Sequence, residues 1–314
     1  MEKIELEDFR IKNSESAWKS EDFQHYKKAG KISIEIKKYA KEIIKPDMLL
    51  LEIAQKIHKK IEELGAIPAF PVNLSIDDIA AHYHPTLNDE TKATGLLKID
   101  IGIQINGFIA DTAFSIDLTP DQKHKDLIKA SEQALENALK KLEKNPDLTL
   151  NEIGRTIQET IENKGFSPII NLSGHGLKEY EIHSSPTIPN YANNNNQTLE
   201  SGAYAIEPFA TTGQGKIYEG PGSNIFALIN QKNTRNPTAR KILDYVTEKY
   251  KTLPFSLREI QEKFGAMSRL AIKQMIQEGL LHEFPQLIEK SHEPVSQAEH
   301  TFIKEKNKII ITTK

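Results

Sequence analysis

The sequence of 314 residues contains no cysteine. Disulfide bonds, thiolate metal sites and cysteine nucleophiles are therefore excluded, and any bound metal must be held by histidine, aspartate, glutamate or water. No stretch reaches the roughly 18 consecutive apolar residues of a membrane-spanning helix. The first 20 residues are polar and mixed in charge, without the apolar segment of a signal peptide. We therefore expect a cytoplasmic protein.

Charge of one sign is also scarce. The sequence has 41 basic and 44 acidic residues, a net charge of -3, and no run of like charge long enough to follow a phosphate backbone. Nucleic acid is therefore not an expected partner. Hydrophobic residues make up 38% of the chain, which at this length supplies the core of one large or two ordinary domains.

Apolar periodicity and turn signals predict helices alternating with strands. The spacing of Ser75 and Asp78 resembles a helix cap and predicts a short helix ending near Ala81. The other predicted helices cover Tyr26–Ile44, Leu49–Leu64, Asp121–Leu142, Leu150–Lys164 and three segments within Pro237–Leu281. The predicted strands are Leu97–Ile105, Phe108–Ile116, Gly202–Phe209 and Val295–Lys304. This order favours an α/β or α+β architecture over a doubly wound sheet.

A predicted hairpin brings two aspartates together. Asn106-Gly107 joins two alternating segments, which is a strong signal for a two-residue turn. Counting outward from this turn places Gly102 opposite Asp111, with Asp100 on the same face. The two carboxylates are then diagonal neighbours, with Cα atoms about 7–8 Å apart, a spacing that suits ions roughly 3.5–4 Å apart. The alternatives are pairing with Lys98 or simple solvation on an exposed sheet face.

Three further candidate ligands interrupt apolar or glycine-rich stretches: His175, Glu207 and Glu299. Each glutamate alone is equally consistent with a surface residue at a strand end, although burial without a partner would be unfavourable. As a set, hard carboxylate oxygens and one imidazole suit Mn, Co, Fe or Zn, and can bridge two ions. Paired ions activate water and polarise a carbonyl group while a carboxylate moves the proton. The set therefore predicts a metal-dependent hydrolase.

From about Tyr26 onward, the chain resembles the type II methionine aminopeptidases, especially their archaeal members. The motifs that carry the resemblance are Ala69-Phe70-Pro71, Ala80-Ala81-His82-Tyr83, Leu97-Lys98-Ile99-Asp100, Asp111-Thr112-Ala113-Phe114, Asn171-Leu172-Ser173-Gly174-His175, Ala205-Ile206-Glu207-Pro208-Phe209 and Gln297-Ala298-Glu299-His300-Thr301. The resemblance implies an α+β pita-bread fold, in which two related halves enclose two divalent ions (Co, Mn, Fe or Zn). It implies removal of the initiator methionine from nascent polypeptides, with preference for a small second residue, by a monomer.

The resemblance also assigns roles to residues. The implied metal ligands are Asp100, Asp111, His175, Glu207 and Glu299. Of these, Asp111 and Glu299 would bridge both ions, and Glu207 would also carry protons. The histidines that match the family's substrate-contacting positions are His82 and His183. The implied pocket for the methionine side chain is lined by Phe70, Ile182, Ile225 and Phe284, which would otherwise be regarded as core residues.

The implied domain organisation has three parts. Residues 1–24 form an extension without a counterpart in the short archaeal forms, residues 25–222 and 285–314 form the catalytic domain, and residues 223–284 form an inserted helical, winged-helix-like subdomain. Gln104 stands where relatives usually carry a histidine, and Ser184-Ser185 replaces the usual small pair beside the second histidine.

Two other functions compete with this interpretation. An Xaa-Pro dipeptidase or aminopeptidase P of the same fold would share the ligands, but such proteins carry a large N-terminal domain, whereas about 25 residues precede the first helix here. A non-catalytic relative associated with ribosomes or nucleic acid would have lost ligands, whereas all five positions here carry competent residues. The inserted helices carry few cations, Arg269 and Lys273 among them, so nucleic-acid binding is not expected. Ribosome contact through this surface stays open.

Overall fold

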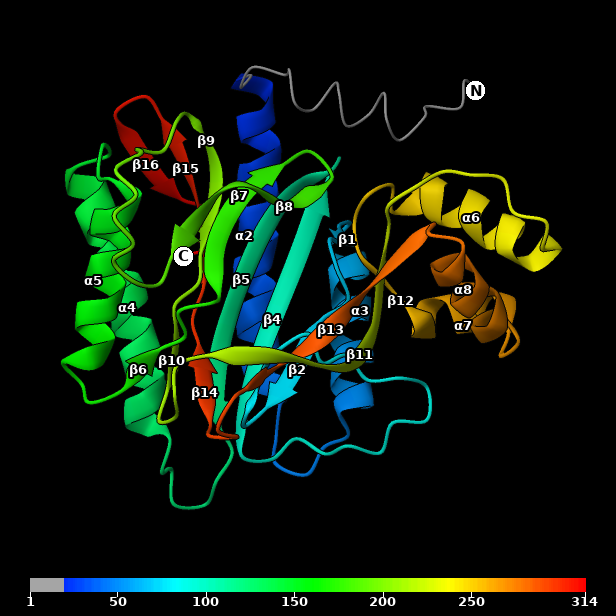
Figure 1. Cartoon of the computed structure of the whole chain (residues 1–314), viewed down its shortest axis with the longest axis horizontal. Helices are drawn as coiled ribbons and strands as arrows, with labels where there is room; N and C mark the ends of the chain where they lie inside the picture. The colour runs from blue at the N-terminus through cyan, green and yellow to red at the C-terminus, as the bar shows by residue number, and fades with distance from the viewer. Residues whose placement is uncertain (1–19) are drawn as a thin grey trace.

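The computed structural model describes residues 20–314 (Figure 1), so most of the predicted extension over residues 1–24 lies outside the described residues. The first half of the fold consists of α2 (Ser20–Ile43), α3 (Leu50–Glu63), β1 (Ile67–Pro68), β2 (Asn73–Ile76), β3 (Ile79–Ala81), β4 (Leu96–Ile105) and β5 (Phe108–Asp117). Helix α2 packs against β4 and β5. Helix α3 buries apolar residues at helical spacing, from Leu50 through Ile53 and Ile57 to Ile61. One apolar core therefore joins these helices to the sheet.

The second half repeats this combination of two helices with antiparallel strands. Its elements are α4 (Lys125–Lys144), α5 (Leu150–Glu162), β6 (Ser167–Pro168), β7 (Ser173–Lys178), β8 (Glu181–Pro189), β9 (Gly202–Ile206), β10 (Phe209–Thr211), β14 (Val295–Gln297), β15 (His300–Glu305) and β16 (Lys308–Ile311). Its larger sheet has the order β16-β15-β9-β7-β8, and β14-β10-β6 forms a smaller one. In Figure 1, α4 and α5 lie side by side at the left, and α2 runs behind β4 and β5. The predicted α+β pita-bread fold is confirmed.

The predicted hairpin is confirmed. Strands β4 and β5 pair with Gly102 opposite Asp111, and Asn106 and Gly107 have φ values of 52° and 88°. Positive φ at both central positions matches a turn whose twist follows that of the strands.

The predicted short helix ending near Ala81 is wrong. The segment instead forms β2 and β3, with Asp77 at φ 46° between them. The Ser75 hydroxyl accepts a hydrogen bond from the Tyr83 peptide N–H at 3.3 Å rather than capping a helix. Strand β2 pairs with β4, and this long-range ladder outweighs the local cap signal.

Three predicted boundaries also shift. Helix α4 begins at Lys125 rather than near Asp121, after a turn in which the Asp117 carboxylate accepts a hydrogen bond from the His124 N–H at 2.6 Å. Each of the two late strands is split, because β9 ends before Glu207 and β14 ends before Ala298. Both predicted glutamate ligands therefore lie where the strands are interrupted.

The inserted region packs around a core of its own. It contains α6 (Pro237–Lys249), α7 (Leu257–Phe264) and α8 (Ser268–Gln277), together with β11 (Ile217–Leu228), β12 (Phe255–Ser256) and β13 (Leu281–Glu289). The three helices lie at one end of the molecule (Figure 1). Strands β11 and β13 run through the predicted boundaries at 222–223 and 284–285, and β13 pairs with β3. The division into domains stays a prediction.

Among residues 20–314, no helix is both long and apolar enough to span a membrane.

Candidate metal centre

A cavity of about 270 Å³ lies over the β4–β5 hairpin, between the two halves and the inserted strands. Every residue that the sequence predicted for the site lines it. These residues are Phe70, His82, Asp100, Asp111, His175, Ile182, His183, Glu207, Ile225, Phe284 and Glu299. The structure therefore brings together side chains that are far apart in the sequence: Phe70 and Glu299 are separated by about 230 positions.

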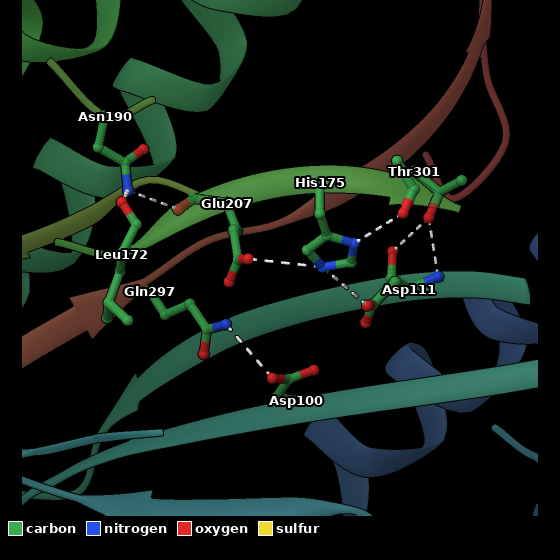
Figure 2. Close-up of polar contacts among 9 residues, drawn as sticks. Asp100, Asp111, Leu172, His175, Asn190, Glu207, Gln297 and Thr301 are labelled. Atoms are coloured by element: carbon green, nitrogen blue, oxygen red, sulfur yellow. Dashed lines mark hydrogen bonds and ion pairs between the residues drawn. The ribbon is translucent and has the colours of Figure 1, made fainter. Parts of the chain in front are cut away.

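The two aspartates point into the cavity from adjacent strands. Figure 2 shows Asp111 on β5 facing His175, and Asp100 on β4 facing Gln297. The Asp111 peptide N–H donates to Thr301 Oγ1 at 2.8 Å, and the same hydroxyl donates to the Asp111 carbonyl oxygen at 2.8 Å. This pair of hydrogen bonds joins β5 to β15 and fixes the Asp111 backbone.

The two glutamates are placed by interruptions in their strands. Glu207 lies between β9 and β10 and precedes Pro208, which lacks the N–H that a strand ladder requires. The Asn190 side-chain amide donates to the Glu207 carbonyl oxygen at 3.2 Å. Glu299 lies between β14 and β15, where its N–H donates to the Ala113 carbonyl oxygen at 3.0 Å. Each glutamate backbone is therefore held by a contact from another segment.

His175 faces both acidic groups across a gap. Its Nε2 atom lies 3.8 Å from Asp111 Oδ2 and 3.6 Å from Glu207 Oε1. Its Nδ1 atom lies 3.2 Å from the Gly176 carbonyl oxygen, which places the proton of the neutral ring on Nδ1 and leaves the Nε2 lone pair toward the carboxylates. The donor atoms of Asp111, His175 and Glu299 all lie within 4.8 Å of one another, which suits a shared cation.

Bound cations would stabilise the ionised form of the four buried carboxylates. Burial, the largest effect, raises the pKa of Asp100 to about 7. Burial followed by repulsion from neighbouring carboxylates raises the pKa of Asp111, Glu207 and Glu299 well above their usual values. Asp111 and Glu299 are only 3% and 1% exposed, so solvation does not stabilise their charge. Lys98 does not pair with them, because its ammonium group donates to the Asp77 carbonyl oxygen at 2.6 Å.

Several buried oxygens also lack partners. Within the part of the chain that the structure describes, Asp100 Oδ1, Asp111 Oδ1 and Glu299 Oε2 accept no hydrogen bond. Burial lowers the pKa of His175 to about 4, so its ring is neutral and able to bind a metal at pH 7. Carboxylate oxygens with one imidazole nitrogen are ligands for divalent transition metals. The residues present therefore fit divalent metal ions.

Two other histidines border the same cavity. His82 has φ 65° and follows β3, and its Nδ1 lies 3.0 Å from the Pro285 carbonyl oxygen. The neutral ring donates from Nδ1, which leaves Nε2 as an acceptor. The His183 ring lies 4.7 Å from that of His175, between centroids. Burial lowers the pKa of His82 and lowers that of His183 well below its usual range, so both rings are neutral at pH 7.

The apolar side of the cavity comes from strands and from the segment after β1. Ile225 on β11 pairs with Phe284 on β13, while Ile182 lies on β8 and Phe70 follows β1. The Phe284 ring lies against His82, with centroids 5.7 Å apart. An apolar pocket thus lies directly beside the carboxylate cluster.

Replacing Gly102 with alanine is expected to disturb this apolar wall. A Cβ atom at Gly102 would overlap the Phe70 ring, so we expect a loss of about 1–3 kcal/mol in the free energy of unfolding, measured by urea denaturation. A smaller side chain in Phe70→Leu leaves room for the added methyl group. The double variant should therefore recover part of the loss, and a purely additive result would contradict the packing explanation.

Sequence reasoning missed residues that support the ligands. Gln297 Nε2 lies 3.4 Å from Asp100 Oδ2. Gln297 is part of the same motif as the proposed ligand Glu299, and this proximity in the sequence could have indicated its role. Asn190 gave no signal, since its contact with Glu207 depends on the tertiary fold. Gln104 does not contact the ligands through its amide oxygen, which accepts a hydrogen bond from the Gly107 N–H at 2.8 Å and so holds the hairpin turn.

Comparisons with known proteins identify the family of the chain. Residues 24–233 match the family described as metallopeptidase family M24. The methionine aminopeptidase of Methanocaldococcus jannaschii is 41% identical over 297 residues, covering 94% of this chain and 99% of that protein. A solved thermophilic Arx1 is similar in fold, with TM-score 0.80, 20% identity and coverage of 94% and 91% of the two chains. The methionine aminopeptidase of Rickettsia prowazekii has TM-score 0.66, 20% identity and coverage of 95% and 99%. The chain therefore belongs to metallopeptidase family M24.

Proposed function

We propose that this protein removes the N-terminal methionine from new protein chains in the cytoplasm, acting as a monomer with two divalent ions. As a member of metallopeptidase family M24, the chain is a metal-dependent hydrolase. The observation that carries the proposal is the direct contact between a carboxylate-rich centre and an apolar pocket in one cavity. Full-length similarity to an archaeal methionine aminopeptidase supports this choice of substrate.

The five proposed ligands are Asp100, Asp111, His175, Glu207 and Glu299. Bound divalent ions would supply water of lowered pKa and would polarise the scissile carbonyl group. Glu207 is suited to take a proton from the attacking water and deliver it to the leaving amine, because its pKa is raised by burial and by Asp100 and Asp111.

The two histidines are proposed to hold the substrate. His82 presents an unprotonated Nε2, because its Nδ1 proton is directed at the Pro285 carbonyl oxygen, and this lone pair can accept a hydrogen bond from a substrate N–H group. His183 lies beside His175 at the metal end of the cavity, where a donated hydrogen bond would stabilise charge on the carbonyl oxygen.

The preference for an N-terminal methionine and for a small second residue is proposed to come from the shape of the cavity. Phe70, Ile182, Ile225 and Phe284 are placed to surround an apolar methionine side chain. A small second residue is proposed because the resemblance to the methionine aminopeptidases implies a narrow cleft at that position.

Replacing His183 with glutamine is expected to lower kcat by about 10²–10³-fold, as loss of one donor to a developing oxyanion does. The Michaelis constant should change much less, because the interaction strengthens only in the transition state. Steady-state kinetics with a Met-Gly peptide measures both constants. A matched control is His292→Gln, since His292 pairs with Asp78 on the surface; equal effects in both variants would contradict the proposed role.

A panel of peptides tests the proposed function. We expect release of methionine from Met-Gly and Met-Ala peptides, slower release from Met-Leu peptides, and no release of other N-terminal residues. Cleavage restricted to Xaa-Pro bonds would identify an Xaa-Pro peptidase instead. No cleavage by the metal-loaded protein of any peptide would favour a binding protein.

A further inference from the structure

A second polar cluster, in which two residues are buried and His58 is half-buried, joins the inserted region to the first half of the fold. It consists of Arg258 on α7, His58 on α3 and His84 after β3. Arg258 is 2% exposed and His84 is 4% exposed. Arg258 Nη2 lies 3.1 Å from His58 Nδ1, although these residues are 200 positions apart in the sequence. None of these residues lines the cavity of the candidate metal centre.

The hydrogen bonds of Arg258 and His58 leave too few acceptors for their N–H groups. The Val72 N–H donates to His58 Nε2 at 3.1 Å, so a neutral His58 carries its proton on Nδ1 and directs it at the Arg258 guanidinium. Two donors then face each other. Arg258 Nε and Nη1 also have no partner among the described residues. If Nδ1 accepts instead, the Val72 N–H loses its acceptor, so one acceptor is missing at His58 in either tautomer. His84 donates from Nδ1 to the Val72 carbonyl oxygen at 2.7 Å, so its Nε2 is an acceptor, but it makes no hydrogen bond to Arg258 or to any other described residue.

Among residues 20–314, no carboxylate forms an ion pair or a hydrogen bond with Arg258. The guanidinium stays protonated at all relevant pH values, and leaving it buried and unpaired is costly. Glu259 and Glu262 act on it only through space. The Glu259 carboxylate binds elsewhere, since Oε2 accepts from Ser256 Oγ at 3.0 Å and Oε1 from the Tyr250 hydroxyl at 3.2 Å. Burial, together with repulsion from Arg258 and His58, lowers the pKa of His84 to about 3, so His84 adds no charge.

We propose that a small monovalent inorganic anion of the chloride type binds at Arg258 and His58. Its ligands are guanidinium N–H groups and the His58 Nδ1–H group, which are donors that an anion requires. The near-complete burial of Arg258 and His84 favours a small ion over a large one. The anion links α7 to α3 and so holds the inserted region against the catalytic region. Ser256, the N-cap of α7, pairs with Ile225, so the same link steadies one wall of the substrate cavity.

The test compares thermal unfolding of the full chain in chloride and in gluconate at equal ionic strength. Chloride should raise the melting temperature by about 3 °C or more, as expected for an ion that binds only the folded state. His58→Glu supplies a covalent carboxylate to Arg258 and should abolish the difference between the two salts. His58→Gln adds no negative charge, so its chloride effect should be larger than that of His58→Glu, although it loses the Nδ1–H ligand.

Crystals soaked in bromide provide a readout that does not depend on any variant. An anomalous peak within hydrogen-bond distance of the Arg258 guanidinium supports the proposal. Equal melting temperatures in chloride and gluconate, or a chloride effect of the same size in His58→Glu, would overturn it. So would the lack of a bromide peak at Arg258, because water would then complete the cluster.

Discussion

Replacing Glu207 with glutamine is expected to lower kcat for methionine release by about 10²–10⁴-fold, the usual contribution of a group that transfers protons. Glutamine keeps the size of the side chain but cannot take up or release a proton. The Glu207 Oε1 atom lies 3.6 Å from His175 Nε2, so the replaced group lies beside another proposed ligand. Single-turnover kinetics with metal-saturated protein measures the chemical step directly.

The matched control is Glu200→Gln, because Glu200 is an exposed glutamate close in sequence. Its kinetics should equal those of the unmodified protein. Calorimetry with Mn²⁺ separates loss of proton transfer from loss of the metal. If Glu207→Gln binds metal fully and turns over at an undiminished rate, Glu207 is not the proton carrier.

After metal removal, the free energy of unfolding is expected to fall as the pH rises from about 4 to 7. Burial raises the pKa of Asp100 from 3.8 to about 7, so without metal the folded state keeps a proton that the unfolded chain releases. The contribution of the protonated Asp100 side chain to the free energy of unfolding is fully present below about pH 4, and it is lost as the pH rises through about 7. For Asp100 alone this amounts to at most about 4 kcal/mol. Asp111, Glu207 and Glu299 shift in the same direction.

Divalent cations should reverse this effect, because they favour the ionised carboxylates. The difference in unfolding free energy between metal-loaded and metal-free protein should therefore increase between pH 4 and 7. Urea denaturation at several pH values measures this difference. Buried histidines such as His84 and His300 have the opposite pH dependence, but both forms share them, so their contribution cancels in the difference. Asp100→Asn should flatten the dependence. A difference that is independent of pH would show that these carboxylates are already ionised without metal.

The hairpin and its aspartates were predictable because their signals are local. The Asn106-Gly107 turn sets the register by itself, and the register then decides which side chains share a face. The helix near Ser75 was predicted wrongly because its cap signal is also local. The strand that forms there, β2, depends on pairing with β4, whose residues lie more than 20 positions away. Local patterns also joined the segments on either side of Glu207 and Glu299 into continuous strands, which the structure interrupts.

The contacts around the ligands were beyond sequence reasoning because they are distant in the chain. The Thr301 hydroxyl that holds Asp111 lies 190 positions away, and the side-chain amide of Gln297 reaches Asp100 over 197 positions. Neither spacing carries a periodic signal. The contact between His58 and Arg258 is of the same kind, so a buried cation without a carboxylate becomes visible only in three dimensions.

The most direct test of the metal-dependent methionine aminopeptidase activity is a titration of chelator-stripped protein with Mn²⁺, followed by release of methionine from a Met-Gly peptide. The arrangement of Asp100, Asp111, His175, Glu207 and Glu299 predicts no release before metal is added and a rise to full activity as the centre fills. Release that is undiminished in the stripped protein would contradict the proposed centre, as would its absence at every metal concentration.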